Sequence, residues 1–228
     1  MSISALLFGA IGTLAETTDL QRRAYNHAFA EAELEWVWDR ESYLRMLHDP
    51  GGRARLTDYA NASGDTIDAD AIHALKKRHF TRLVEQEGIQ PRPGVLELLR
   101  TCQRRDIAVA LCTTTDPEQV DLILDNLAPG VGVDDFDWIG DRGSARRPKP
   151  SPDIYAAALA ELDLPADDVL AIEDTPESAE AALKAGIRTI AFPGEAAANR
   201  EFQSGVLIVD RLQARLVDLQ SGRRVAAE

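Results

Sequence analysis

The sequence predicts an α/β protein: a parallel sheet flanked by helices, with a helical module inserted after the first strand. Several short runs of Ile, Val, Leu and Ala do not alternate with polar residues, which is typical of buried parallel strands. Helical patterns separate these runs, as in βαβ units with right-handed crossovers. One long stretch near the N-terminus carries helical patterns alone, which indicates the inserted module.

The sheet is predicted from apolar runs that follow one another along the chain. The four strong runs are 3–10 (ISALLFGA), 107–114 (IAVALCTT), 168–174 (DVLAIED) and 187–193 (IRTIAFP). A fifth run, GVLIVDRL at 205–212, is weaker. Helices are expected where apolar residues recur three or four positions apart, at 93–105, 116–128, 151–163 and 176–186.

The inserted module is predicted from a region that breaks the strand–helix alternation. Its helical patterns cover 17–34, 39–49, 51–63 and 68–88. The chain then returns through IQPRPGV, whose proline and glycine content is typical of a hinge between domains. We therefore predict an α/β core made of 1–16 and 91–228, and a helical domain of 17–90.

The composition excludes several classes of function. The 228 residues carry a net charge of -13, which disfavours partners such as nucleic acid or anionic membranes. No segment approaches the roughly 18 apolar residues of a membrane span. The N-terminus lacks the basic region and the cleavage site of a secretory signal. We expect a cytoplasmic monomer in which Cys102 and Cys112 are reduced thiols.

Chemically useful residues follow the predicted strands at their carboxyl ends, where ligands bind in open α/β sheets. The first strand runs into GAIGTL, the second into CTTTD, and the third into IEDT, with RRPKPSPDIY before it. Each signal is weak by itself, because Thr and Asp often cap helices and KPSPD resembles a turn. Their order along the chain is the stronger observation: a hydroxyl cluster, a lysine and an acidic pair.

That order resembles the haloacid dehalogenase (HAD) superfamily of phosphatases and phosphomutases, a Rossmann-like core with an inserted helical cap. The first family motif, D-x-D-G-T-L, is matched at its end by GTL at 12–14. The residues that match the other motifs are Thr113, Lys149, Glu173 and Asp174. The cap and its flanks are similar to the CbbY-like branch, which is associated with sugar bisphosphates such as xylulose 1,5-bisphosphate.

The resemblance implies a mechanism in which the first Asp attacks phosphorus and the second Asp moves protons. A Mg²⁺ cofactor bridges the nucleophile and the phosphate, and in this chain its ligands would include Glu173 and Asp174. Lys149 and Thr113 match the positions that hold the phosphoryl oxygens, and they are the candidate catalytic residues that remain.

This chain departs from the family at the two reacting positions. Alignment on GTL places Gly9 where the nucleophile belongs and Ile11 where the acid/base belongs. Two smaller departures point the same way: Ser178 stands where the fourth motif has Gly, and Gln21 replaces a His of the cap side. We therefore predict that the standard aspartyl-phosphate reaction does not occur here, and that Mg²⁺ binds weakly.

The surviving groups are predicted to bind an anion, with a small phosphorylated metabolite as the expected partner. Thr113, Thr114, Thr115 and Lys149 form the predicted phosphate cradle at a helix N-terminus. On the cap, Arg53 and Arg55 are candidates for a second phosphate, or else belong to a solvated helix face. Glu16, at the cap hinge, is placed on the side of the leaving group.

Three hypotheses remain open from the sequence. The first is an impaired HAD homologue that binds a phosphorylated metabolite. The second is an active phosphatase on sugar (bis)phosphates that works by a non-standard route. The third is a structural or interaction protein without a ligand.

Overall fold

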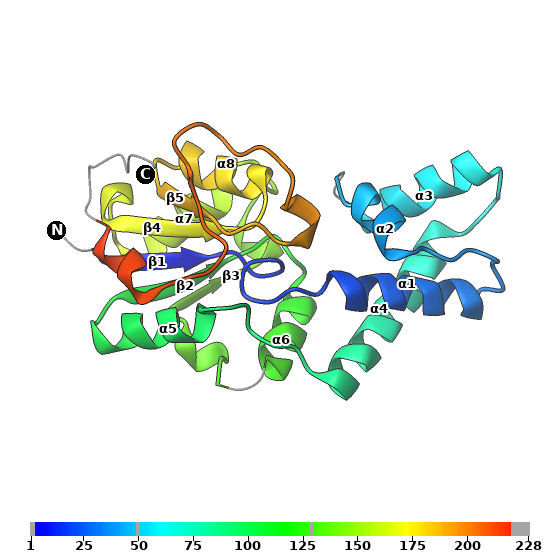
Figure 1. Cartoon of the computed structure of the whole chain (residues 1–228), viewed down its shortest axis with the longest axis horizontal. Coiled ribbons are helices and arrows are strands. Elements are labelled where there is room, and N and C mark those ends of the chain that lie inside the picture. Colours follow the sequence, from blue (N-terminus) through cyan, green and yellow to red (C-terminus); the bar gives the residue numbers. More distant parts are fainter. Residues whose placement is uncertain (1–2, 49–50, 128–129, 220–228) are drawn as a thin grey trace. The chain divides into compact units, whose positions relative to one another are not determined.

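The computed structural model describes residues 3–48, 51–127 and 130–219. The chain separates into two compact units (Figure 1): one comprises Met1–Glu16 and Ile89–Glu228, and the other Thr17–Gly88. The first unit contains the sheet, and the second is helical. The return to the first unit lies two residues earlier than the sequence analysis placed it, at Ile89 instead of residue 91.

A parallel six-stranded sheet organises the core unit, in the strand order β3-β2-β1-β4-β5-β6. Its strands are β1 (Ala5–Phe8), β2 (Ala108–Cys112), β3 (Trp138–Gly140), β4 (Val169–Glu173), β5 (Arg188–Ala191) and β6 (Leu207–Ile208). The side chains of β1 and β4 are all buried, because helices cover both faces of the sheet. The α/β fold class predicted from the sequence is confirmed.

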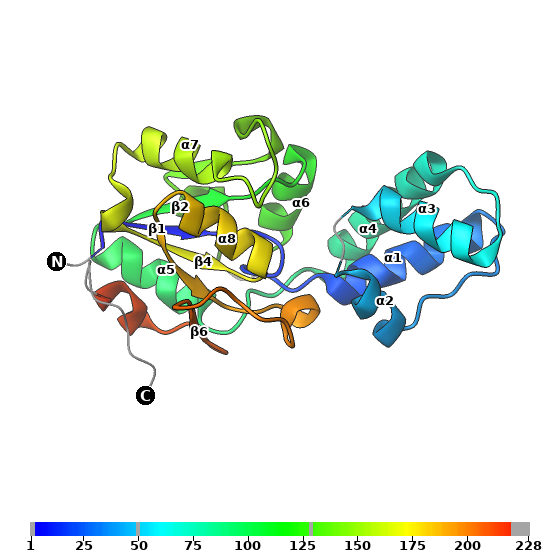
Figure 2. The same cartoon turned by 90° about the horizontal axis from the view of Figure 1, so that it is seen from above.

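Helices pack on both faces of this sheet (Figure 2). The core helices are α5 (Val95–Arg104), α6 (Pro117–Asn126), α7 (Asp153–Leu162) and α8 (Pro176–Lys184). One face packs against α7 and α8, where Leu7 and Ala171 join Ile154 and Ala182 in a single apolar cluster. Helix α5 covers the opposite face. A short 3-10 turn, Ala214–Asp218, packs against α5.

The strand β3 is absent from the sequence prediction, and the structure adds it at the edge of the sheet. It has three residues, and its Trp138 and Ile139 are only half-buried. A run this short carries no periodicity that separates a strand from a loop. Its pairing with β2 is what defines it, through Ala110 opposite Trp138.

The second unit is a helical domain, as the sequence predicts. Its helices are α1 (Thr18–Glu31), α2 (Arg40–Met46), α3 (Gly52–Ser63) and α4 (Ala69–Glu87). An aromatic cluster fills its centre, with the rings of Tyr25, Phe29 and Trp38 in mutual contact. Trp38 is 1% exposed, so its large apolar surface contributes to the core of this unit.

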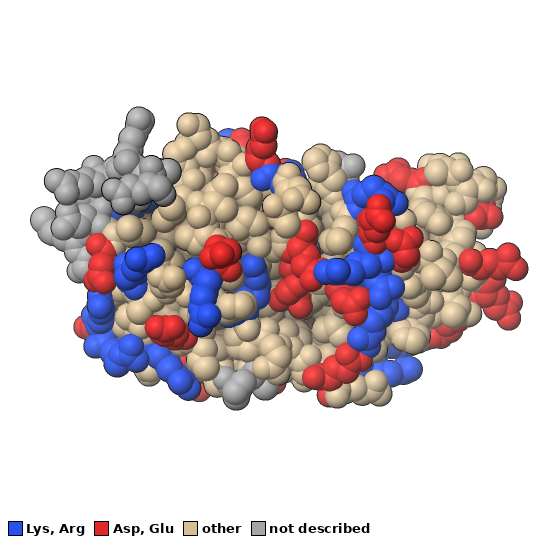
Figure 3. Space-filling view, in the orientation of Figure 1, with Lys and Arg blue, Asp and Glu red and all other residues tan. Residues whose placement is uncertain are grey.

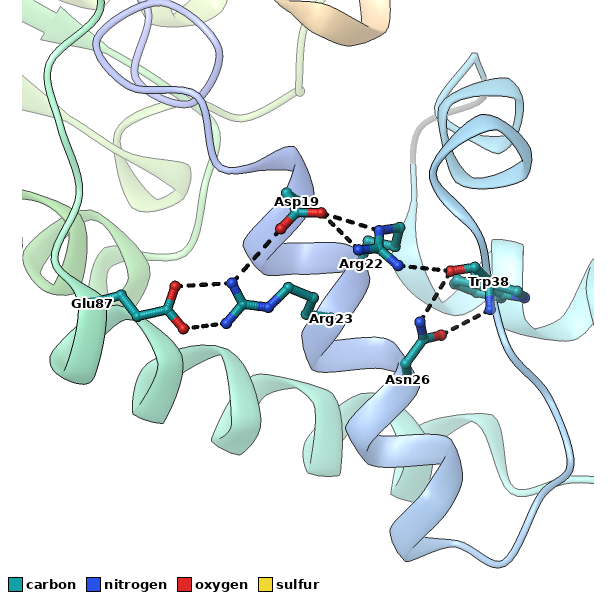
Figure 4. A network of polar contacts seen from close by, with 6 residues as sticks. All are labelled: Asp19, Arg22, Arg23, Asn26, Trp38 and Glu87. Carbon is teal, nitrogen blue, oxygen red and sulfur yellow. Dashed lines mark hydrogen bonds and ion pairs between the residues drawn. The ribbon is translucent and has the colours of Figure 1, made fainter.

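Polar contacts join the helices of this domain to one another (Figure 4). Arg23 of α1 forms a bidentate ion pair with Glu87 of α4 and also contacts Asp19. Asn26 holds the segment before α2, since its side chain accepts from Trp38 N at 2.8 Å and donates to Trp38 O at 3.0 Å. These bonds orient α1 relative to α4 and to the extended chain at Trp38.

No helix in the described part of the chain is both long enough and apolar enough to span a membrane. The two cysteines, Cys102 and Cys112, are free and buried, as expected. Burial raises the pKa of the Cys102 thiol to about 12, so this thiol stays protonated and unreactive near neutral pH.

Candidate functional site

The register of the sheet brings the predicted motifs together at one edge. Phe8, the last residue of β1, lies opposite Leu111 of β2 and Ile172 of β4. The residues that follow these positions therefore emerge side by side, because parallel strands end at the same edge of the sheet. Gly9, Thr113 and Glu173 are consequently neighbours, although at least 60 positions separate any two of them along the chain.

The turn after β1 is held by its own backbone. Gly12 N donates to Ala15 O at 2.8 Å, and Leu14 N donates to Ala10 O at 2.8 Å. Gly12 has a φ of +82°, and a Cβ atom added there would lie 2.0 Å from Asp174 Oδ2. Both observations require glycine at this position. The GTL end of the first motif thus has a structural explanation in this chain.

Gly9 is packed against the acidic pair. A Cβ atom added at Gly9 would lie 2.6 Å from Glu173 Oε2 and 2.6 Å from Thr13 Oγ1. Gly9 N donates to Ile172 O at 3.0 Å, so the backbone stays bonded to β4. The Glu173 carboxylate therefore fills the space that a side chain at position 9 would occupy.

Glu173 is itself held by two partners from the opposite side of the site. Lys149 Nζ donates to Glu173 Oε1 at 2.5 Å and to Cys112 O at 2.9 Å. The Tyr155 hydroxyl donates to the same Glu173 oxygen. Glu173 is 1% exposed, and its Oε2 atom has no hydrogen-bonding partner in the described part of the chain. The lysine predicted to hold phosphate thus carries a buried counter-charge of its own.

Asp174, the second residue of the acidic pair, lies over the turn after β1. Thr13 Oγ1 donates to Asp174 Oδ1 at 3.4 Å. Loss of solvation, together with the negative charge of Glu173, raises the pKa of Asp174 to about 7. Its surroundings therefore favour the uncharged form more than water would.

The threonines after β2 are positioned by a short network of hydroxyls. Thr113 is 6% exposed, and its Oγ1 accepts from Thr115 N at 3.1 Å. Thr113 Oγ1 also donates to Thr115 Oγ1 at 2.9 Å. Thr114 is half-buried between them. Backbone and hydroxyl donors thus gather at the end of β2, just before α6 begins at Pro117.

Glu16 and Arg92 connect the turn after β1 to the loop that follows β5. Glu16 Oε2 accepts from Glu195 N at 2.8 Å. Arg92 donates to three carbonyl oxygens: Gly12 O, Phe192 O at 2.8 Å and Pro193 O at 2.7 Å. Its guanidinium also stacks on the Phe192 ring, 3.5 Å from the centroid. Arg92 is a positioning residue that reading the sequence did not identify, because its acceptors are all backbone atoms.

The two arginines predicted on the cap have different surroundings. Arg53 is exposed and forms an ion pair with Asp70 at 2.9 Å. Arg55 is half-buried: its Nε donates to Met46 O at 3.0 Å, and its guanidinium lies 5.7 Å from the Tyr43 ring centroid. Of these two, only Arg55 reaches the interior of the helical domain.

Lys76 is a buried cation of the cap that the sequence analysis did not select. It is 5% exposed, its Nζ bonds to Gln21 Oε1, and it lies 5.2 Å and 5.0 Å from the centroids of the Tyr25 and Phe80 rings. Burial, with Arg55 and Lys77 nearby, lowers its pKa to about 7. The sequence does contain a signal: Lys76 falls on the apolar face of α4, four residues from Phe80.

The residues at the strand ends do not fit a family-type Mg²⁺ site. Among the described residues there is no group of three or more Asp, Glu, His or Cys side chains that could hold a metal. Glu173 is bound to Lys149 and Tyr155, and position 9 offers no carboxylate. Mg²⁺ requires near-octahedral oxygen coordination, which Asp174 alone does not supply from its side chain.

The fold and this arrangement match one known group of proteins. A family model described as haloacid dehalogenase-like hydrolase matches residues 3–186. The chain belongs to this family. The fold class implied by the resemblance, a Rossmann-like HAD core with a helical cap, is therefore confirmed.

Relatives place the chain in the CbbY-like branch of this family. It is 37% identical to the plasmid-encoded protein CbbY of Cupriavidus necator, over 92% of this chain and 86% of that protein. It is 36% identical to protein CbbY of Cereibacter sphaeroides, over 91% of this chain and 92% of that protein. The resemblance to the CbbY-like branch is confirmed.

Solved structures agree with this placement. CbbY from Rhodobacter sphaeroides in complex with phosphate matches with a TM-score of 0.80 and 34% identity, covering 92% of this chain and 94% of that one. A mutant of that protein, in complex with xylulose-(1,5)bisphosphate, matches with a TM-score of 0.79, the same identity and the same coverage.

Proposed function

We propose that this chain is a catalytically impaired member of the HAD family that binds a phosphorylated metabolite of the sugar (bis)phosphate class. The observation that carries this proposal is the lack of a carboxylate at both reacting positions, Gly9 and Ile11. Glycine has no side-chain atom to attack phosphorus, and isoleucine has no group that exchanges a proton near neutral pH. The aspartyl-phosphate route of the family therefore has neither its nucleophile nor its acid/base.

The neighbouring carboxylates are poor substitutes for the missing ones. Glu173 is 1% exposed, and one of its oxygens is bound by Lys149 and Tyr155. Asp174 lies against the turn after β1, next to Thr13. Burial keeps the Glu173 carboxylate from reaching a phosphorus atom. Its ion pair with Lys149 also stabilises the carboxylate and so makes it a weaker nucleophile. Loss of a nucleophile in other enzymes leaves only the rate enhancement due to binding and charge stabilisation, about a thousandfold over water.

Lys149 supports the binding part of the proposal. A lysine ammonium group has three donors, and Lys149 uses two of them on Cys112 O and Glu173 Oε1. The third is available to an anion at the strand ends, together with the hydroxyls at Thr113 and Thr115 and the half-buried Thr114. Because Glu173 already neutralises Lys149, we expect a phosphate to bind with modest affinity.

Relatives indicate the class of ligand. CbbY from Rhodobacter sphaeroides was solved with phosphate and, as a mutant, with xylulose-(1,5)bisphosphate. Family phosphatases use Mg²⁺, but we propose weak Mg²⁺ binding here, because Lys149 and Tyr155 hold Glu173 and position 9 has no carboxylate. In the cap, we propose that Lys76 and Arg55 bind a phosphate group, since the hydrogen-bonding partner of Lys76 among the described residues is an amide, Gln21.

Two measurements on the purified full-length chain test the proposal. The first is phosphate release from xylulose 1,5-bisphosphate and a panel of sugar phosphates, with Mg²⁺. We expect no release above background from the unmodified chain, and release from the Gly9→Asp/Ile11→Asp double variant. Turnover by the unmodified chain, or a covalent phospho-intermediate on it, would contradict the impairment and favour a non-standard route.

The second measurement is calorimetric titration with inorganic phosphate and with xylulose 1,5-bisphosphate. The informative variant is Lys149→Met/Glu173→Gln, which removes both charges of the buried pair together and so leaves no uncompensated charge. Lys184→Met is the matched control, because Lys184 is exposed and forms its ion pair with Glu180 of its own helix. We expect one saturable binding event that the double variant loses and the control keeps. No binding by the unmodified chain would favour a structural protein without a ligand.

A further inference from the structure

A second cationic surface lies in the core unit, away from the strand ends. It is a pocket of about 480 Å³ beside α5, which we call the arginine pocket. The residues that line it are Pro91, Arg92, Pro93, Gly94, Leu96, Glu97, Arg100, Arg104 and Arg211. Four are arginines, and Glu97 is the only acidic residue among them. None of the predicted strand-end residues lines it, so it is a separate feature of the molecule.

The charge of this surface is opposite to that of the chain as a whole. The protein carries a net charge of -13, yet Lys and Arg side chains gather over α5 in Figure 3. Arg100 and Arg104 lie one helical turn apart on α5, and Arg211 joins them from the segment after β6. A local concentration of positive charge on an acidic protein attracts small anions to that point of the surface.

The arginines of the pocket have unused donors. Within the described residues, Arg100 and Arg211 have no hydrogen-bonding or ion-pair partner. Arg104 uses one nitrogen, since its Nη2 donates to Thr101 Oγ1 at 2.9 Å. Arg92 is different, because its guanidinium is committed to backbone carbonyls. Arg100, Arg104 and Arg211 are therefore the groups available to a ligand.

The N-terminus of α5 adds to this positive potential. The residue before the helix, Gly94, has no side chain that caps the first-turn N–H groups. Its φ is +89°, and a Cβ atom added there would lie 1.9 Å from Leu212 O, so a capping side chain is excluded. The positive end of the helix dipole therefore lies at the pocket, where it favours an anion.

The lining also restricts the kind of anion. Guanidinium groups bind phosphate oxygens through paired N–H donors, so several arginines suit a ligand with more than one phosphate. The pocket has no aromatic residue in its lining, and therefore no surface for stacking a nucleobase. We propose that the arginine pocket is a binding site for a compact anion with two phosphate groups, separate from the candidate site at the strand ends.

Calorimetric titration of the full-length chain with inorganic diphosphate, without metal, tests this site. The variant Arg100→Gln/Arg211→Gln removes the two unpartnered arginines. Both are exposed, so the variant is expected to fold. We expect it to bind one diphosphate fewer per chain, or to bind at least about tenfold more weakly, because charge-assisted hydrogen bonds to phosphate are lost. Affinity of the unmodified chain should fall as NaCl is raised.

Arg82→Gln is the matched control, because Arg82 is an exposed arginine on α4, in the other unit. It changes the net charge in the same direction and should leave stoichiometry and affinity unchanged. Equal binding by the unmodified chain and the Arg100/Arg211 variant would overturn the proposal. An equal loss in the Arg82 control would also overturn it, since the effect would then reflect net charge. Lys149→Met/Glu173→Gln, which alters only the strand-end site, should retain the Arg100-dependent binding.

Discussion

The core and the cap each hold a largely buried lysine, and the two lysines differ in their partners. In the core, Lys149 pairs with the buried carboxylate of Glu173 at 2.5 Å. In the cap, Lys76 is 5% exposed and meets the amide of Gln21 and two aromatic rings. The core site is therefore neutralised from within, whereas the cap holds a cation that an incoming anion can stabilise. This difference is why we propose a phosphate contact at Lys76 in the cap.

The largest expected effect comes from separating the core pair. Lys149→Met alone leaves Glu173 buried without a counter-charge, and we expect it to lower the free energy of unfolding by about 3–5 kcal/mol. The double variant Lys149→Met/Glu173→Gln should cost much less. Urea unfolding of the three proteins measures both changes. Equal losses in the single and double variants would mean that the pair is not the source of the effect.

The buried lysine of the cap should make the free energy of unfolding depend on pH. The pKa of Lys76 is about 7 in the folded chain and about 10.5 when unfolded, so between these values only the unfolded chain holds the proton. The free energy of unfolding should therefore rise from pH 7 to pH 10, by up to about 4 kcal/mol. Below pH 7 both states are protonated and the full penalty remains.

Lys76→Met should abolish that rise and stabilise the cap at pH 7. Trp36 and Trp38 report unfolding of this unit by fluorescence, since both lie in its core. The positive charges that act on Lys76 are Arg55 and Lys77, and both side chains are present in the variant as in the unmodified chain. Lys77→Met is the control at the adjacent position, which is only half-buried, and it should retain the rise with pH. A flat pH profile in the unmodified chain would contradict the explanation.

A smaller effect is expected from filling the space at Gly9. Gly9→Ala places a methyl group about where Glu173 Oε2 lies, so the carboxylate must shift while Lys149 and Tyr155 hold its other oxygen. We expect a loss of about 1–2 kcal/mol, in the range of other overpacked sites. Gly132→Ala is the control, because Gly132 has open space around it. Gly205 is not suitable, because its φ of +85° would strain an alanine. A neutral Gly9→Ala would show that Glu173 moves freely.

The smallest effect on stability should come from Arg53. Its ion pair with Asp70 is exposed, so Arg53→Ala should change the free energy of unfolding by less than about 1 kcal/mol. It should also leave binding of a sugar bisphosphate unchanged, whereas Arg55→Ala should weaken that binding. Titration of both variants separates the two arginines. The reverse order of effects would mean that the cap binds phosphate at its surface instead of beside Lys76.

Reading the sequence identified most of the fold because its signals are local. The runs that form β1, β2, β4 and β5 are apolar over consecutive residues, and the helices between them repeat every three or four positions. The edge strand β3 was missed because three residues, two of them half-buried, carry no such pattern. At the site, the observation behind the proposed impairment is equally local, since Gly9 and Ile11 stand two residues apart in one motif.

What the sequence by itself determined is therefore the order of the elements and which chemical groups are present. Only the tertiary structure decided how those groups are paired. Glu173 pairs with Lys149 and fills the space over Gly9. Arg55 reaches the cap interior while Arg53 does not, and Arg100 and Arg211 line the same pocket. The physical reason is that charge pairing and burial depend on distances through space, and the contacts that set them join residues far apart along the chain.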